Sequence, residues 1–169
     1  MKKCPEKIKI DNSMGRSLVL FLFFCTLSCV LPRKLYTEVT PLITMKRTPC
    51  YGECPQYMIS IYESGKVLYN GVRFVQKTGC FQSNINRQKI NYIKFLLDEI
   101  QFFDLDDKYI SEVTDLPSVI TEVFVNGNRH KVIDRLEAPK KLKNLYAELD
   151  LLVDEISIWE ECNGLEEVD

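Results

Sequence analysis

Apolar residues recur along this chain first with a period of two and later at every third or fourth position, and this change constrains the fold most. Tyr57, Ile59 and Ile61 alternate with the residues between them, as in a half-buried strand. From Asn86 onward the apolar positions follow one stripe of a helix: Ile90, Ile93, Leu97, Ile100 and Phe103. A second helical series follows Pro139: Leu142, Leu145, Leu149, Leu152, Ile156 and Trp159. Strands and helices must therefore share one core.

Turn signals divide the period-two parts of the chain into short strands. Besides the strand at 57–61, the pattern predicts strands at residues 42–48, 67–69, 72–77, 119–125 and 128–134. Asn126-Gly127 between two β-rich runs is a strong hairpin signal, and Asn70-Gly71 marks another turn. Residues 104–117 are predicted to form a loop.

These elements predict an α+β domain with a mainly antiparallel sheet, in the order strand meander, helix, β-hairpin, helix, with two helices packed on one face. The last apolar series also resembles a coiled-coil seam between two copies, but it is shorter than the three to four heptads that such a seam shows. We expect the domain at residues 42–160, between a tether at 30–41 and an acidic tail at 161–169.

The first 29 residues have the layout of a signal peptide. Basic residues precede an apolar run, Leu18 to Leu27, that spans about 15 Å as a helix, half of a bilayer's hydrocarbon core. Thr26-Leu27-Ser28-Cys29 resembles a bacterial lipobox, with Thr where Leu is usual. The sequence therefore predicts a membrane-anchored lipoprotein of the cell envelope, lipidated at Cys29. The alternatives are cleavage near Ser28, which would give a secreted or periplasmic protein, and an uncleaved N-terminal anchor. A true start at Met14 would leave the compact basic segment Met14-Gly15-Arg16 before the apolar run.

Four cysteines remain after Cys29, and in an oxidising compartment an even set is first interpreted as disulfides. Cys50 and Cys54 are close enough in sequence to close a short loop, which would leave Cys80 to pair with Cys162. The other pairings stay open. A zinc site would need four ligands, and a thiol oxidoreductase has two residues between its cysteines, where this chain has three. We expect no metal and no cofactor.

The other polar residues give little sign of catalysis or of nucleic-acid binding. After Cys29 the chain holds 17 Lys and Arg against 22 Asp and Glu, so we expect no nucleic acid as a partner. His130, the single histidine, lies in a predicted hairpin strand without an obvious triad. The acidic group at residues 104–107 fails the EF-hand pattern, because Lys108 occupies the fifth position and no glycine follows.

The segment Pro49-Cys50-Tyr51-Gly52-Glu53-Cys54-Pro55, with Tyr57 soon after it and Gly65 at the following turn, carries a family resemblance. It is similar to an uncharacterised bacterial family, domain of unknown function 6438, and the similarity extends over residues 42–160. The resemblance implies a secreted or lipid-anchored chain but no particular activity. Cys80 and Cys162 lie outside the family's pattern.

The leading hypothesis for function is a non-enzymatic binding or structural module of the envelope. Its lipid would reach the membrane, and its partner would be an envelope protein or a cell-wall component. The candidate binding surface is the proline-flanked loop with the tyrosine that follows it: Pro49, Tyr51, Gly52, Glu53, Pro55 and Tyr57. The loop could instead be only a stapled turn. The rival class is a thiol-redox protein or enzyme that uses Cys50 and Cys54.

Overall fold

The fold is taken from a computed structural model that describes residues 40–113 and 115–162. The predicted signal peptide, the lipidation at Cys29, nearly all of the tether and residues 163–169 of the acidic tail lie outside these ranges. Within them, no helix is long and apolar enough to cross a membrane.

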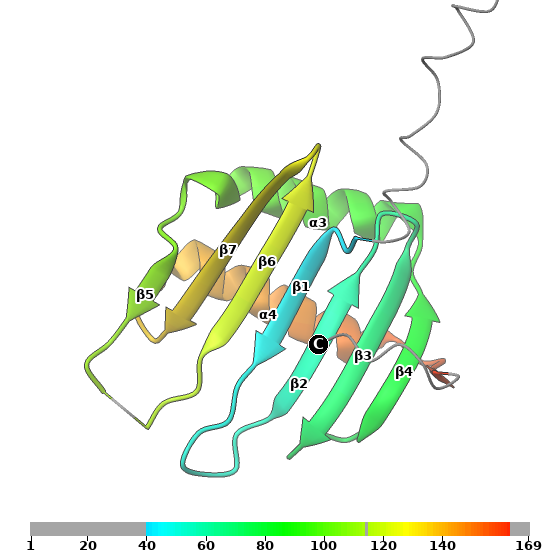
Figure 1. Cartoon of the computed structure of the whole chain (residues 1–169). Helices are drawn as coiled ribbons and strands as arrows, with labels where there is room; N and C mark the ends of the chain where they lie inside the picture. Colours follow the sequence, from blue (N-terminus) through cyan, green and yellow to red (C-terminus); the bar gives the residue numbers. More distant parts are fainter. Residues whose placement is uncertain (1–39, 114, 163–169) are drawn as a thin grey trace, which may run out of the picture. The chain divides into compact units, whose positions relative to one another are not determined.

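Eight strands form one sheet in the order β5-β7-β6-β1-β2-β3-β4-β8 (Figure 1). The strands are β1 (Ile43–Arg47), β2 (Gln56–Ile61), β3 (Lys66–Arg73), β4 (Gly79–Asn84), β5 (Lys108–Ile110), β6 (Val119–Val125), β7 (Asn128–Arg135) and β8 (Glu160–Glu161). Every neighbouring pair is antiparallel except β5 and β7, which run parallel. The prediction of an α+β domain with a mainly antiparallel sheet is confirmed.

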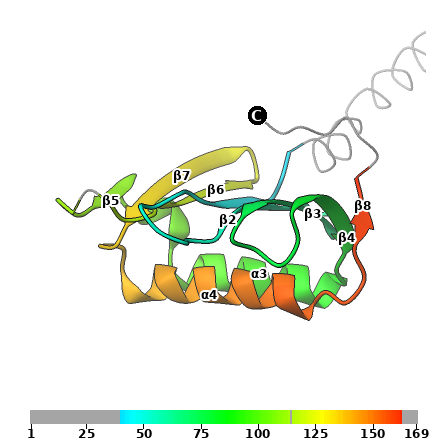
Figure 2. The same cartoon turned by 90° about the horizontal axis from the view of Figure 1, so that it is seen from below.

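Two helices, α3 (Arg87–Glu99) and α4 (Lys140–Glu155), lie against the same face of the sheet (Figure 2). Asn86 caps α3, because its side chain accepts a hydrogen bond from the Lys89 amide at 2.9 Å. Both helices bury their apolar stripes in a core that includes Met45 and Ile59 of the sheet. The buried helix residues are Ile90, Ile93 and Leu97 in α3, and Leu142, Leu145, Tyr146, Leu149 and Leu152 in α4.

The segment between α3 and β6 differs from the sequence prediction. Gln101 adopts a positive φ of 52°, which ends the helical stripe and leads into a 3-10 turn, η2 (Phe102–Asp104). This turn buries Phe102 in place of the predicted Phe103, which is exposed. The predicted loop at 104–117 also contains β5, a three-residue edge strand that is too short to show a period.

The predicted break at Asn70-Gly71 is wrong, because β3 continues through both residues. The predicted strand at 72–77 is also wrong, because β3 ends at Arg73 and the chain reverses at residues 74–77. It then forms β4, which no sequence pattern predicts. A Cβ atom on Gly71 would lie 1.9 Å from the Lys77 carbonyl oxygen. Glycine is therefore needed at position 71 because the backbone of the β3–β4 turn packs against β3 there, and not because residue 71 forms a turn.

The chain after α4, residues 156–162, forms a strap that runs to the edge of the sheet beside β4. The apolar series predicted a helix as far as Trp159, but α4 ends at Glu155. Glu160 and Glu161 of β8 pair with β4, and Cys162 lies beside Cys80. The first residue assigned to the acidic tail, Glu161, thus belongs to the sheet.

Two disulfides join the four described cysteines, in the pairing that the local spacing favours. Cys50 and Cys54 have Cα atoms 5.8 Å apart, and Cys80 and Cys162 have Cα atoms 5.4 Å apart. Both distances fall in the usual range for a disulfide. The two bonds indicate an oxidising, extracytoplasmic location.

The two disulfides should contribute unequally to stability, because they close loops of very different length. In the chain-entropy model, a separation of 82 residues gives about 4.5 kcal/mol and a separation of four gives about 2 kcal/mol. We expect the Cys80→Ser/Cys162→Ser variant to lose more free energy of unfolding in urea than the Cys50→Ser/Cys54→Ser variant. Equal losses, or the reverse order, would contradict this assignment of roles.

Candidate functional site

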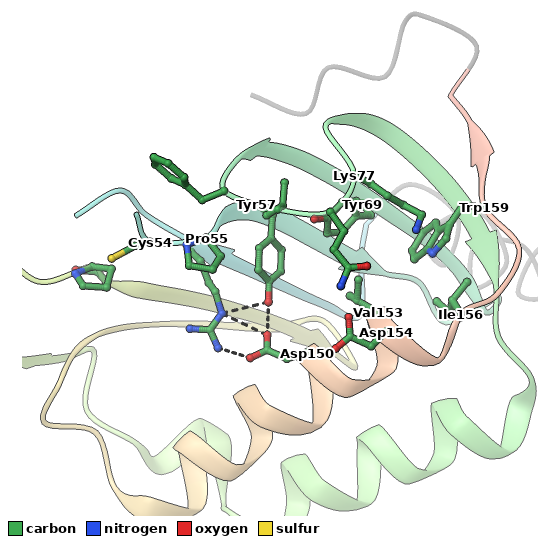
Figure 3. A pocket seen from close by; sticks show the side chains of 16 residues that line it. Cys54, Pro55, Tyr57, Tyr69, Lys77, Asp150, Val153, Asp154, Ile156 and Trp159 are labelled. Carbon is green, nitrogen blue, oxygen red and sulfur yellow. Dashed lines mark hydrogen bonds and ion pairs between the residues drawn. The ribbon is translucent and has the colours of Figure 1, made fainter. Parts of the chain in front are cut away.

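A pocket of about 570 Å³ lies between the sheet and the second half of α4, beside the loop that joins β1 to β2 (Figure 3). We call that loop, residues 48–55, the cysteine loop. The lining consists of Arg47, Tyr57 and Tyr69 from strands, residues 74–77 from the β3–β4 turn, Asp150, Val153 and Asp154 from α4, Ile156 and Trp159 from the strap, and Cys54, Pro55, Pro117 and Ser118 from loops. Four separate stretches of the chain, within residues 47–57, 69–77, 117–118 and 150–159, therefore build one cavity.

Three side chains form a hydrogen-bonded network at the inner wall of this pocket. Arg47 and Tyr57 are cross-strand partners on β1 and β2, and both face Asp150 of α4. Arg47 donates from Nη2 to Asp150 Oδ2 at 2.5 Å and from Nε to Oδ1 at 3.3 Å. Arg47 Nε also donates to the Tyr57 hydroxyl at 3.1 Å, and that hydroxyl donates to Asp150 Oδ1. The carboxylate thus has three donors and joins α4 to two strands.

Burial and charge act together on the protonation of this network. Burial first, and the hydrogen bond to Asp150 second, raise the pKa of Tyr57 above its ordinary value. Burial disfavours the charged guanidinium of Arg47, but Asp150 and Tyr57 outweigh it, so the pKa of Arg47 is also raised. Tyr57 therefore stays a neutral donor and Arg47 a cation at physiological pH. The network is suited to holding α4 in place rather than to moving protons.

An aromatic row extends from this network to the strap. The rings of Tyr57 and Tyr69 have centroids 5.4 Å apart, and the rings of Tyr69 and Trp159 have centroids 5.7 Å apart. Tyr57 and Tyr69 are buried, whereas Trp159 is partly exposed. The row therefore ends in a partly exposed indole ring that lines the pocket.

Lys77 and Asp154 are the free charges of the pocket. They lie on opposite sides of it, Lys77 on the β3–β4 turn and Asp154 on the last turn of α4 (Figure 3). Both are exposed, and neither forms an ion pair with another residue in the described part of the chain. They are available to a ligand, in contrast to Arg47 and Asp150, which neutralise each other.

The cysteine loop presents most of the predicted binding surface to solvent. Its exposed members are Pro49, Tyr51, Gly52, Glu53 and Pro55, and Tyr51 is 93% exposed. The disulfide and a hydrogen bond from the Gly52 amide to Cys50 Sγ, 3.2 Å long, hold the loop in shape. Tyr57, the last residue of the predicted surface, is instead buried in the pocket wall.

His130 and the acidic loop do not line this pocket. His130 packs against the Phe102 ring at a centroid distance of 5.6 Å, and its Nε2 lies 3.0 Å from the Leu105 carbonyl oxygen. In residues 40–113 and 115–162, no group of three or more His, Cys, Asp and Glu side chains is placed to hold a metal ion.

Among the pocket residues, the sequence patterns indicate Tyr57, Cys54 and Pro55 as site residues but not the charged side chains. Asp150 gives no such signal, because it lies between Leu149 and Leu152 without breaking the apolar series of α4. Its partner Arg47 lies 103 residues away in sequence, at the end of the first strand. No local pattern connects two residues at such a separation.

The fold and the pocket define a small α+β domain with two disulfides and a ligand-sized cavity beside the cysteine loop. The family model for a domain of unknown function (DUF6438) matches residues 41–153, and the chain belongs to this family. The match includes the cysteine loop and Asp150 and ends before the strap with Trp159. No curated protein and no solved structure matches the chain.

Removal of the Asp150 carboxylate should destabilise the domain. Asp150→Ala leaves the half-buried Arg47 guanidinium and the buried Tyr57 hydroxyl without their acceptor, which we expect to cost about 2 kcal/mol in urea unfolding. Asp154→Ala, one turn further on, removes a carboxylate without a described ion pair and should change the free energy of unfolding by less than about 0.5 kcal/mol. Equal losses in the two variants would show that the network does not hold α4.

Proposed function

We propose that the chain is a lipid-anchored envelope protein whose domain is a non-enzymatic binding module. Its ligand would contact the cysteine loop and enter the adjoining pocket. The observation that carries this proposal is that Cys54 and Pro55 of the disulfide-closed cysteine loop are themselves part of the pocket wall. If the loop served only to close a turn, nothing would require it to form the wall of a ligand-sized cavity.

The chemistry of the pocket supports binding more than catalysis. Ligand sites are concave and largely apolar, with a few placed polar groups, and this one combines aromatic rings with Lys77 and Asp154. The polar groups at its inner wall are occupied by one another. A pre-shaped cavity beside a cross-linked loop loses little conformational entropy when a ligand arrives.

The exposed ring of Tyr51 supports a protein or cell-wall contact at the loop itself. A tyrosine that is 93% exposed at the tip of a disulfide-closed loop presents a large, rigid contact area with a polar end. Phe74, which lines the same pocket from the β3–β4 turn, is 43% exposed. The two rings would flank a partner that reaches the cavity.

Loss of the Tyr51 side chain should weaken capture of the partner without unfolding the domain. We expect Tyr51→Ala to reduce recovery of a specific envelope component in a cross-linking pull-down by about tenfold or more, as for an exposed aromatic hot spot. Tyr92→Ala, which removes an exposed tyrosine from α3, is the matched control and should retain capture. Circular dichroism would check folding. Equal capture by both variants would refute the loop as the contact surface.

The rival function is thiol-redox chemistry at Cys50 and Cys54. Its support is that both cysteines are partly exposed, so a thiol substrate could reach their disulfide. Alkylation of the native protein under graded reduction separates the two functions. Reduction of Cys50–Cys54 at a potential typical of catalytic disulfides would support the rival. A bond that opens only with unfolding would support the binding module.

The anchor has its own test, because lipidation at Cys29 is independent of what the domain binds. We expect cells expressing the full chain with a labelled fatty acid to yield a labelled protein, and Cys29→Ala to abolish the label. Cys25→Ala, a cysteine inside the apolar run, is the control and should keep the label. A label that survives Cys29→Ala would contradict the lipoprotein assignment.

A further inference from the structure

We propose that the pocket binds a neutral saccharide, with one sugar ring stacked on Trp159 and its hydroxyl groups held by Asp154 and Lys77. This inference rests on the proposed function and names the ligand class of the same site. It is carried by the partly exposed indole at the end of the aromatic row, together with two free charges of opposite sign on either side of the cavity (Figure 3).

The charges of the pocket favour a ligand without net charge. Arg47 and Asp150 neutralise each other in a two-point ion pair, which leaves Lys77 and Asp154. One is a cation and the other an anion, so neither an anionic nor a cationic ligand gains from the field of the whole site. A ligand that both donates and accepts hydrogen bonds satisfies both: hydroxyl groups donate to the Asp154 carboxylate and accept from the Lys77 ammonium.

The aromatic row favours a ligand with a flat apolar face. A pyranose ring carries hydroxyl groups at its rim and C–H groups on its faces, so it can stack on an indole while its rim bonds to polar side chains. Trp159 offers such a surface, and Tyr69 supports it from behind with ring centroids 5.7 Å apart and planes 50° apart. Val153 and Ile156 extend the apolar area next to the indole.

The strap positions Trp159 and thereby completes the site. Trp159 directly precedes β8, whose residues Glu160 and Glu161 pair with β4. Three residues after Trp159, the Cys80–Cys162 disulfide and a hydrogen bond from the Cys162 amide to the Cys80 carbonyl oxygen, 3.1 Å long, fix the strap to the sheet. Trp159 lies outside residues 41–153, which the family model matches.

The single tryptophan of the chain makes the first test direct, since all tryptophan fluorescence comes from the pocket. Cellotetraose, chitotetraose and maltotetraose serve as neutral probes, titrated into the folded protein to millimolar concentration. We expect at least one of them to change the emission of Trp159 in a saturable way. No response to any of the three would overturn the inference.

Variants then assign the signal to the proposed contacts, with calorimetry as the readout. Trp159→Ala should weaken binding of the responding sugar by about tenfold, whereas Trp159→Phe, which keeps a stacking ring, should weaken it less. Asp154→Asn should also weaken binding, and Asp98→Asn on the exposed side of α3 is its matched control. Affinity unchanged in Trp159→Ala and Asp154→Asn would overturn the inference, because the sugar would then bind elsewhere.

A fourth probe, the zwitterionic peptide tetra-alanine, separates the failure of this inference from the failure of the binding function. A saturable fluorescence response to the peptide but to none of the sugars would overturn the saccharide and leave the pocket as a binding site. Silence of all four probes, with partner capture still dependent on Tyr51, would overturn the saccharide alone. Silence together with capture that is independent of Tyr51 would overturn both proposals.

Discussion

The carboxylate of Asp150 is the contact on which the arrangement of the rest depends. It is the point where α4 is bonded to β1 and β2 at once, and the side chains involved come from the ends of those strands nearest the cysteine loop. Apolar packing alone would let a helix slide or rotate on a sheet, because the hydrophobic effect is not directional. The two-point geometry of Arg47 with Asp150 allows one position only. The strap and Trp159 follow directly from the end of α4, so their place depends on this contact.

Such a contact determines orientation more than it adds free energy. Half-buried charges lose hydration when they pair, and the gain from their attraction is offset by that loss. A leucine at position 150 could also pack on the sheet. It would form no directional bonds to Arg47, so it would not fix the position of α4 along the sheet. Because Asp150, Arg47 and Tyr57 also line the pocket, the energetic cost of the network is linked to the shape of the cavity.

The sequence predicted those parts of the fold that repeat locally. The strands at Ile43–Arg47 and Gln56–Ile61, the Asn126-Gly127 hairpin and both helices follow from periodicity and turn chemistry, and the Cys50–Cys54 pair follows from spacing. The short edge strands β5 and β8 were missed because two or three residues show no period. The turn after β3 was misplaced because Gly71 is required by the close approach of the Lys77 carbonyl, which lies six residues further on.

The site was less predictable than the fold, because its parts are distant in sequence. The cysteine loop was recognisable, but its neighbours Arg47 and Asp150 are brought together only by the sheet and α4. The apolar series predicts Trp159 on the core face of a helix, but α4 ends at Glu155 and Trp159 lies on the extended strap. An apolar pattern in the sequence indicates that a residue is buried, but it does not show which cavity the residue lines.

The direction of β1 gives the domain a polarity. The described chain enters the sheet at Leu42, and the cysteine loop begins at the other end of the strand, after Arg47, about 16 Å away. The start of β1 therefore lies at one end of the sheet, while the cysteine loop and the pocket lie toward the other. A partner at the cysteine loop would therefore meet the domain at the end of the sheet opposite to the start of β1.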